Sequence, residues 1–316
     1  MVSLPRGARV PPVERAAKVG ALAALGTEAL YGGSFVFTKG VTETIDPFTL
    51  LAWRFGVALG VLLVLVALRV VRLTLSRASV APLLVLAFLQ PLAYYAAETY
   101  GVMRTTASES ALIISAIPVV MLVTAAVIVG TRPSRRQATG IAVTLVGVLV
   151  VVAASGLSAR FDPLGYLLLF GAVLAFSLYA AFAHRFADTT DVDRTFVMVA
   201  SGAAVFGAIA LAQHGVAGTI PTLVSLPLAQ PSFGVAVAFL ALGPTIGAFF
   251  LQNVAIRHLG ATRFSTFIGM STLVTIVLGA SVLGERLGWA QWLGGVAILG
   301  GVYLANRRHR GEPLGD

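Results

Sequence analysis

The chain has 316 residues, of which 58% are hydrophobic and only 11% are charged, with a formal net charge of +9. Soluble domains keep about a quarter of their residues charged, so this composition excludes a soluble globular protein and predicts an integral membrane protein. The absence of cysteine excludes disulfides, thiolate metal sites and cysteine nucleophiles.

Ten apolar segments are long enough to cross a hydrocarbon core as a helix, which needs about 20 residues. We expect these spans at residues 17–38, 47–69, 80–102, 108–130, 137–155, 163–184, 194–214, 232–255, 261–283 and 289–306. The predicted fold is therefore an all-α integral membrane protein with ten transmembrane helices. Its basic residues lie in short clusters between the spans, which is typical of membrane topology and not of a nucleic-acid-binding face.

The arginine and lysine residues are distributed unevenly between the two sides of the membrane. If the N-terminus is cytoplasmic, the outer face keeps only four of them, Lys39, Arg104, Arg160 and Arg286. Basic residues are enriched in cytoplasmic loops, so both termini are expected in the cytoplasm. The cytoplasmic tails are then residues 1–16 and 307–316.

Two parts of the chain resemble each other at a constant offset of 154 positions. "GTRPSRRQATGI" at 130–141 aligns without a gap with "GERLGWAQWLGG" at 284–295, and residues 98–148 share twelve identities with 252–302. Chance similarity in a chain rich in Ala, Leu, Val and Gly is the alternative. Because each copy has five spans, an odd number, the copies would have opposite orientations in the membrane, as in many secondary transporters.

We assign the first five-helix repeat to residues 17–155 and the second to residues 156–306. The two polar identities between the copies, Arg132 with Arg286 and Gln137 with Gln291, are the most informative ones.

Small residues and prolines recur at equivalent places in the two repeats. Gly140 and Gly147 match Gly294 and Gly301, a spacing that lets two helices approach closely. Pro91 and Pro244 fall inside the third and eighth spans at nearly the same level. The prolines predict either a simple kink or a break that faces a cavity.

Several short motifs resemble EamA-type transporters of the drug/metabolite transporter superfamily. "YGGSFVFTK" at 31–39, Pro47 and "LAWRFGVA" at 51–58 are similar to the opening of these proteins. "GERLGWAQWLGGVAILGGVYL" at 284–304 is similar to the close of their second repeat. The resemblance implies ten helices, a central cavity between the halves, and transport of metabolites, amino acids or drugs. The chain departs from the pattern at Tyr31, where tryptophan is more usual, which leaves the substrate open.

Ionisable residues inside the spans are the main candidates for function, because a charge near the centre of a membrane is costly. Glu28 lies in the middle of the first helix, with no basic residue at its own depth in any span. Such a carboxyl group suits the binding of a proton or a cationic group, although a bond to a neighbouring helix is an alternative. Arg54 and Glu98 lie at similar depths and are expected to form a structural ion pair, unless Glu98 takes part in coupling.

Helical spacing and the repeat gather further candidates around these carboxyl groups. Glu28 and Tyr31 share a face of the first helix, and Tyr94 and Glu98 share a face of the third. The repeat places equivalent residues on the eighth helix. The candidate substrate-binding or coupling residues are Glu28, Tyr31, Tyr94, Glu98, Phe249, Gln252 and Asn253. Aromatic rings beside carboxylates favour a cationic or zwitterionic solute through cation–π attraction, although the rings could equally serve packing.

These observations predict a secondary transporter that moves small organic solutes across a bacterial inner membrane by alternating access. Proton coupling through Glu28 is a hypothesis, and a passive channel is the alternative function. An intramembrane enzyme is disfavoured, since the chain contains neither an HExxH motif nor a serine with a histidine at the same depth. We expect no cofactor and no metal. The expected partners are the solute and the bilayer, for a monomer or a homodimer.

Overall fold

The structure is a computed structural model, and it describes residues 12–75, 77–129, 134–156, 161–183, 190–259, 267 and 269–306. The helices of the first half of the chain are α1 (Pro12–Thr42), α2 (Pro47–Ala67), α3 (Arg77–Ala87), η1 (Phe88–Ala93), α4 (Tyr94–Arg104), α5 (Ala107–Ile114), α6 (Ile117–Val129) and α7 (Arg135–Gly156). Those of the second half are α8 (Pro163–Ala183), α9 (Asp191–Val216), α10 (Ile220–Ala229), α11 (Pro231–Leu242), η3 (Gly243–Gly247), α12 (Ala248–Leu259), α14 (Met270–Val282) and α15 (Trp289–Asn306).

The described part of the chain contains helices and no strands, which confirms the all-α part of the predicted fold. Eight helical segments in it are long and apolar enough to cross a membrane. The last two expected spans, 261–283 and 289–306, correspond to the shorter apolar helices Met270–Val282 and Trp289–Ala305. The beginning of the first of these spans lies outside the described residues, so the count of ten stays a prediction. Most of the two expected tails, 1–11 and 307–316, also lies outside them.

Two of the spanning segments are interrupted at equivalent levels. A wide helical turn, η1, separates α3 from α4, and there Gln90 leaves the helical region with φ −142° and ψ 119° next to Pro91. A second wide turn, η3, separates α11 from α12 and contains Pro244. Proline has no N–H to donate, and such turns widen the helix locally. Irregular backbone at membrane depth is tolerated only where it faces protein or a cavity, so both turns indicate an internal site.

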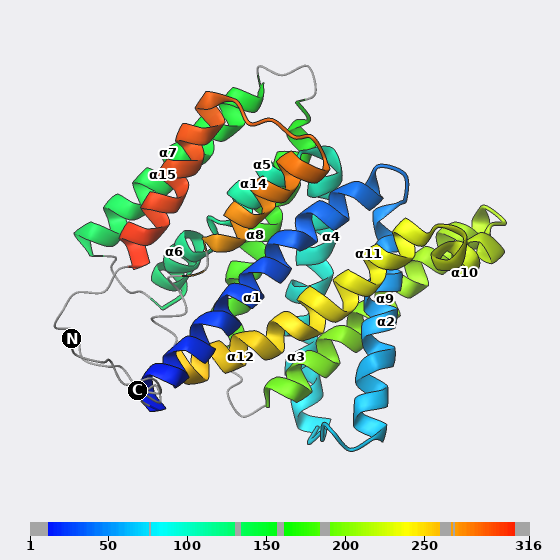
Figure 1. Cartoon of the computed structure of the whole chain (residues 1–316). Coiled ribbons are helices and arrows are strands. Elements are labelled where there is room, and N and C mark those ends of the chain that lie inside the picture. The colour runs from blue at the N-terminus through cyan, green and yellow to red at the C-terminus, as the bar shows by residue number, and fades with distance from the viewer. Residues whose placement is uncertain are drawn as a thin grey trace, which may run out of the picture.

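The main contacts between helices recur when equivalent helices of the two halves are exchanged. Helix α1 packs against α12 and α14, and α8 correspondingly packs against α4 and α6. Helix α2 packs against α9, and α7 packs against α15 (Figure 1). Exchanging each of these helices with its counterpart in the other half therefore reproduces these contacts. At the α2–α9 contact, Phe55 and Phe206 have ring centroids 5.6 Å apart.

The backbones of α7 and α15 approach each other closely. A Cβ atom built on Gly147 would lie 2.7 Å from the carbonyl oxygen of Gly294, and one built on Gly301 would lie 2.7 Å from that of Gly140. Gly140, the earlier glycine of α7, thus faces Gly301, the later one of α15, and Gly147 faces Gly294. The two helices therefore run antiparallel. Glycine is required at these positions because any side chain would collide with backbone atoms.

The glutamines that match between the repeats have the same local role. The backbone N–H of Ser134 donates to Oε1 of Gln137 over 2.8 Å, and that of Gly288 donates to Oε1 of Gln291 over 2.7 Å. Each glutamine thereby satisfies an N–H group at a helix start that has no partner inside the helix. The identity that the sequence comparison found thus corresponds to a repeated helix cap.

Candidate functional site

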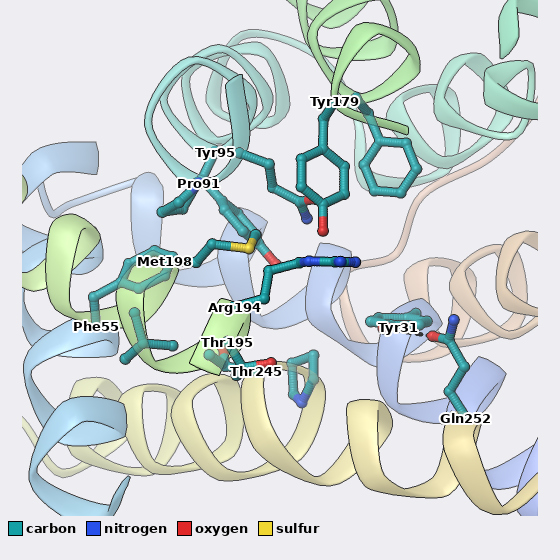
Figure 2. Close-up of a pocket in the computed structure, with 14 residues that line it drawn as sticks. Tyr31, Phe55, Pro91, Tyr95, Tyr179, Arg194, Thr195, Met198, Thr245 and Gln252 are labelled. Carbon is teal, nitrogen blue, oxygen red and sulfur yellow. Dashed lines mark hydrogen bonds between the residues drawn. The ribbon is translucent and has the colours of Figure 1, made fainter. Parts of the chain in front are cut away.

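A cavity of about 190 Å³ lies between the halves of the chain, where the interrupted segments meet. Both halves contribute to its wall: Tyr31, Phe55, Gln90, Pro91 and Tyr95 from the first, and Phe176, Tyr179, Arg194, Thr195, Met198, Val199, Pro244, Thr245 and Gln252 from the second (Figure 2). Two residues of each wide turn, Gln90 and Pro91 of η1 and Pro244 and Thr245 of η3, are among them, as the interrupted backbone indicated. The wall is mostly aromatic and apolar, with a few converging polar groups, which is typical of small-molecule sites.

Two of the candidates from the sequence, Tyr31 and Gln252, meet at this cavity. The hydroxyl group of Tyr31 on α1 donates a hydrogen bond to Oε1 of Gln252 on α12, over 3.3 Å. This hydrogen bond connects the first half of the chain to the second at the cavity wall.

Tyr94 was expected beside the site, but its neighbour Tyr95 lines the cavity instead. Tyr94 is buried and packs edge-on against Tyr95 and Phe176. The expectation for Tyr94 assumed a regular α-helix through the whole third span. At η1 the backbone of Gln90 leaves the helical region next to Pro91, so α4 does not continue the faces of α3 in regular register, and Tyr95 lies at the wall in place of Tyr94.

Arg54 lies directly behind the cavity wall. Its side chain is 3% exposed, its Nε donates to Oγ1 of Thr245 over 3.0 Å, and its Cζ lies 4.4 Å from the centre of the Tyr95 ring. The expected direct ion pair with Glu98 is not found in the described part of the chain. The guanidinium group is turned toward Thr245 and Tyr95, and Oε2 of Glu98 is buried without a hydrogen-bond partner there.

Glu28 is buried at the contact between α1 and α14. It is 3% exposed, and the side chain and backbone amide of Ser271 both offer its carboxyl group hydrogen bonds. Ser271 is the second residue of α14, so the carboxyl group lies at the N-terminus of that helix, where unpaired N–H groups and the helix dipole attract negative charge. Glu28 therefore lies one helical turn from Tyr31 but is not part of the cavity wall.

The remaining candidates do not line the cavity or lie outside the description. Glu98 is buried on α4, three residues after Tyr95 of the wall. Phe249 and Asn253 belong to α12, but their side chains are outside the described part.

Arg194 is the functional candidate that the sequence interpretation missed. It lies in the first turn of α9, and Figure 2 shows its guanidinium group reaching into the cavity near the hydroxyl group of Tyr179. In the sequence it begins the predicted span 194–214, and because it is not one of the four basic residues of the outer face, the predicted topology counts it with the cytoplasmic loop. The long side chain of an arginine at a helix end can reach inward as well as toward the interface. The position of Arg194 at the end of a span could therefore have indicated a residue of an internal site.

The glutamate of the "GERLG" motif has a structural role away from the cavity. Oε1 of Glu285 accepts a hydrogen bond from the N–H of Ala107 over 2.7 Å, and Oε2 accepts one from the N–H of Ser108 over 3.0 Å and one from its hydroxyl over 2.6 Å. These are the first residues of α5. The carboxylate of the second half thus caps a helix of the first half, where the helix dipole favours a negative charge.

We expect the substitution Glu285→Gln to destabilise the protein by about 1–3 kcal/mol, because the amide lacks the charge and turns a donor toward backbone N–H groups. Thermal unfolding of the purified protein in detergent measures the effect. The neighbouring substitution Arg286→Gln is the control, since Arg286 is exposed and should change stability by less than about 0.5 kcal/mol. Equal melting temperatures for the two variants would contradict the capping role.

Comparisons with known proteins agree with this architecture. The EamA-like transporter family matches residues 18–153 and again residues 163–307. The chain is 31% identical over 287 residues to the "Uncharacterized transporter YcxC" of Bacillus subtilis (strain 168), covering 90% of this chain and 92% of the relative. It is 26% identical over 290 residues to the "Uncharacterized transporter YyaM" of the same organism, covering 89% of this chain and 92% of that relative.

The fold also has a counterpart among solved structures. One crystal structure matches with a TM-score of 0.58 at 20% identity and covers 92% of this chain and 98% of that one. The family matches each half of the chain, and a relative of nearly the same length is more than 30% identical to it. These two findings assign the chain to a family. The chain belongs to the EamA-like transporter family and is a multi-pass membrane transporter.

Proposed function

We propose that this chain is a secondary transporter of small organic solutes that works by alternating access between two inverted five-helix halves, residues 17–155 and 156–306. The observation that carries this proposal is the cavity, which lies at the junction of the halves, is lined by both, and coincides with an interrupted helix in each. Discontinuous helices around a central site are characteristic of secondary transporters. The proposed setting is a bacterial inner membrane, with both termini in the cytoplasm.

The inversion is supported by the pairing of the helices. The contacts of α1 with α12 and α14 have counterparts in those of α8 with α4 and α6. The antiparallel contact of α7 with α15 is what a two-fold axis in the membrane plane requires of equivalent helices. Movement of one half against the other would then expose the central cavity to each side in turn.

Glu28 is the proposed coupling residue. Its carboxyl group joins α1 to the N-terminus of α14, and Tyr31, one turn further along α1, lines the cavity. Binding a proton would remove the negative charge from the helix N-terminus and weaken this connection. Protonation would thereby loosen α1 from α14 and link the proton to the movement of a helix that contacts the solute.

A labelling experiment tests the inverted topology. Ser134 and Gly288 are equivalent in the repeat and both are exposed, yet inversion places them on opposite sides of the membrane. Because the chain has no cysteine, the single variants Ser134→Cys and Gly288→Cys can be labelled without background. In intact cells, an impermeant maleimide should label the cysteine at position 288 and leave the one at position 134 unmodified.

Inside-out vesicles provide the control and should give the reverse pattern. Labelling of both variants from the same side would mean an even number of spans between the two positions and would reject the five-plus-five arrangement. Accumulation of a solute against its own gradient in proteoliposomes separates the proposed transporter from a passive channel.

A further inference from the structure

The charge of the cavity wall differs from the one expected. The wall was predicted to hold carboxylates, yet Arg194 is the single charged residue among the described residues that line it. The two nearby carboxyl groups are buried elsewhere: Glu28 is directed at Ser271, and Glu98 is not part of the wall. A second cation, Arg54, contacts the wall from behind through Thr245 and Tyr95. One positive charge thus lies in the cavity wall and a second contacts it, whereas neither carboxyl group is part of the wall.

The groups around Arg194 can complete an anion site. Figure 2 shows its guanidinium group between the hydroxyl group of Tyr179 and the ring of Tyr31, with Thr195 on the same helix turn. A guanidinium group presents several N–H donors in one plane, a geometry that matches the two oxygens of a carboxylate. The remaining wall, with Phe55, is mostly aromatic and apolar, and its polar residues Gln90, Thr245 and Gln252 are uncharged, which suits an organic body more than a second charge.

The size of the cavity limits the solute further. Sites for drug-sized ligands measure about 300–1,000 Å³, and this cavity measures about 190 Å³. A bulky cationic drug therefore fits neither the volume nor the charge. An amino acid remains compatible, but it would be held by its carboxylate and not by its ammonium group.

We propose that the cavity binds a small organic anion with an apolar body, and that its charged group, a carboxylate, is bound by Arg194. This inference rests on the proposed transport function and specifies the solute. It makes Arg194 a binding residue that determines the sign of the charge that the site accepts.

The charge of the site can be measured without knowing the solute. Met198 lines the cavity close to Arg194. Because the chain has no cysteine, Met198→Cys places a single reactive thiol in the site. We would compare the rates at which this thiol reacts with an anionic reagent, sulfonatoethyl methanethiosulfonate, and a cationic one, trimethylammonioethyl methanethiosulfonate. Each rate is divided by that of a small thiol in solution, so that intrinsic reactivity cancels.

The anionic reagent should be favoured by roughly tenfold, as expected for one charge in a partly buried site. Adding Arg194→Gln should remove the preference, and Arg194→Lys should retain most of it. Arg286→Gln, which changes an exposed arginine, should have no effect. A preference for the cationic reagent, or a preference that is unchanged by Arg194→Gln, would overturn the proposal. If the thiol is reached from both sides of the membrane but prefers the cation, alternating access stands and only the assigned charge of the solute is wrong.

Discussion

The substitution Gly301→Ala should strongly destabilise the folded protein, because the contact between α7 and α15 leaves no space for a methyl group. A Cβ atom at this position would lie 2.6 Å from the backbone nitrogen of Thr144 and 2.7 Å from the carbonyl oxygen of Gly140. Both are backbone atoms that cannot rotate away, so the two helices would have to separate. Overpacking of this kind costs about 1–3 kcal/mol, and the lost contact between the halves should add to it.

The adjacent residue offers a matched control on the same helix. A Cβ atom on Gly300 meets no atom within 4 Å, so Gly300→Ala should leave stability unchanged or slightly increase it. Thermal unfolding in detergent, together with the yield of monodisperse protein in gel filtration, measures both variants. If the two variants melt at the same temperature, α7 and α15 do not approach each other as closely as described.

The substitution Glu28→Gln should abolish solute-dependent proton movement in proteoliposomes while the protein remains folded. The amide keeps the shape of the side chain and can still accept a hydrogen bond from Ser271, but it cannot bind and release a proton. Uptake driven by a pH gradient should therefore fall to the background of empty liposomes. Exchange of solute without a gradient should persist, because the cavity wall is unchanged.

The same chemical change in an exposed loop is the control. Glu43 lies in the connection between α1 and α2, and Glu43→Gln should leave proton movement intact. If Glu28→Gln retains pH-driven uptake, Glu28 has only the structural role of holding the N-terminus of α14, and the coupling group lies elsewhere.

Family membership shows the transport function of the chain but not its solute. The cavity narrows the choice because its volume and its charge are properties of this chain's own residues. Arg194 and Glu28 then have separate roles in the proposed mechanism, since one would bind the anionic group of the solute and the other would bind the proton. The two experiments are independent, because a coupling defect at Glu28 leaves the charge of the cavity unaltered.

The class of the protein and the framework of its fold could be predicted from the sequence alone. A span requires a long apolar run because lipid cannot satisfy polar groups, and this requirement is local enough to be recognised in the residues themselves. The repeated glutamine caps at Gln137 and Gln291 and the glycines of α7 and α15 were also recognisable, since equivalent positions in a repeat have equivalent neighbours. Pro91 and Pro244 marked the interrupted segments for the same kind of reason.

The composition of the site was decided only by the tertiary structure. Helical spacing predicted Tyr94 at the cavity, but the wide turn at Pro91 rotated the following helix and put Tyr95 there. Depth in the membrane suggested that Arg54 would pair with Glu98, but depth does not specify which way a side chain points around the helix axis, and Arg54 faces Thr245. Arg194 was counted with the loop because a position at the end of a span does not reveal where a long side chain reaches. Sequence determines where each helix crosses the membrane, while rotations about the helix axes and contacts between distant helices determine which residues meet.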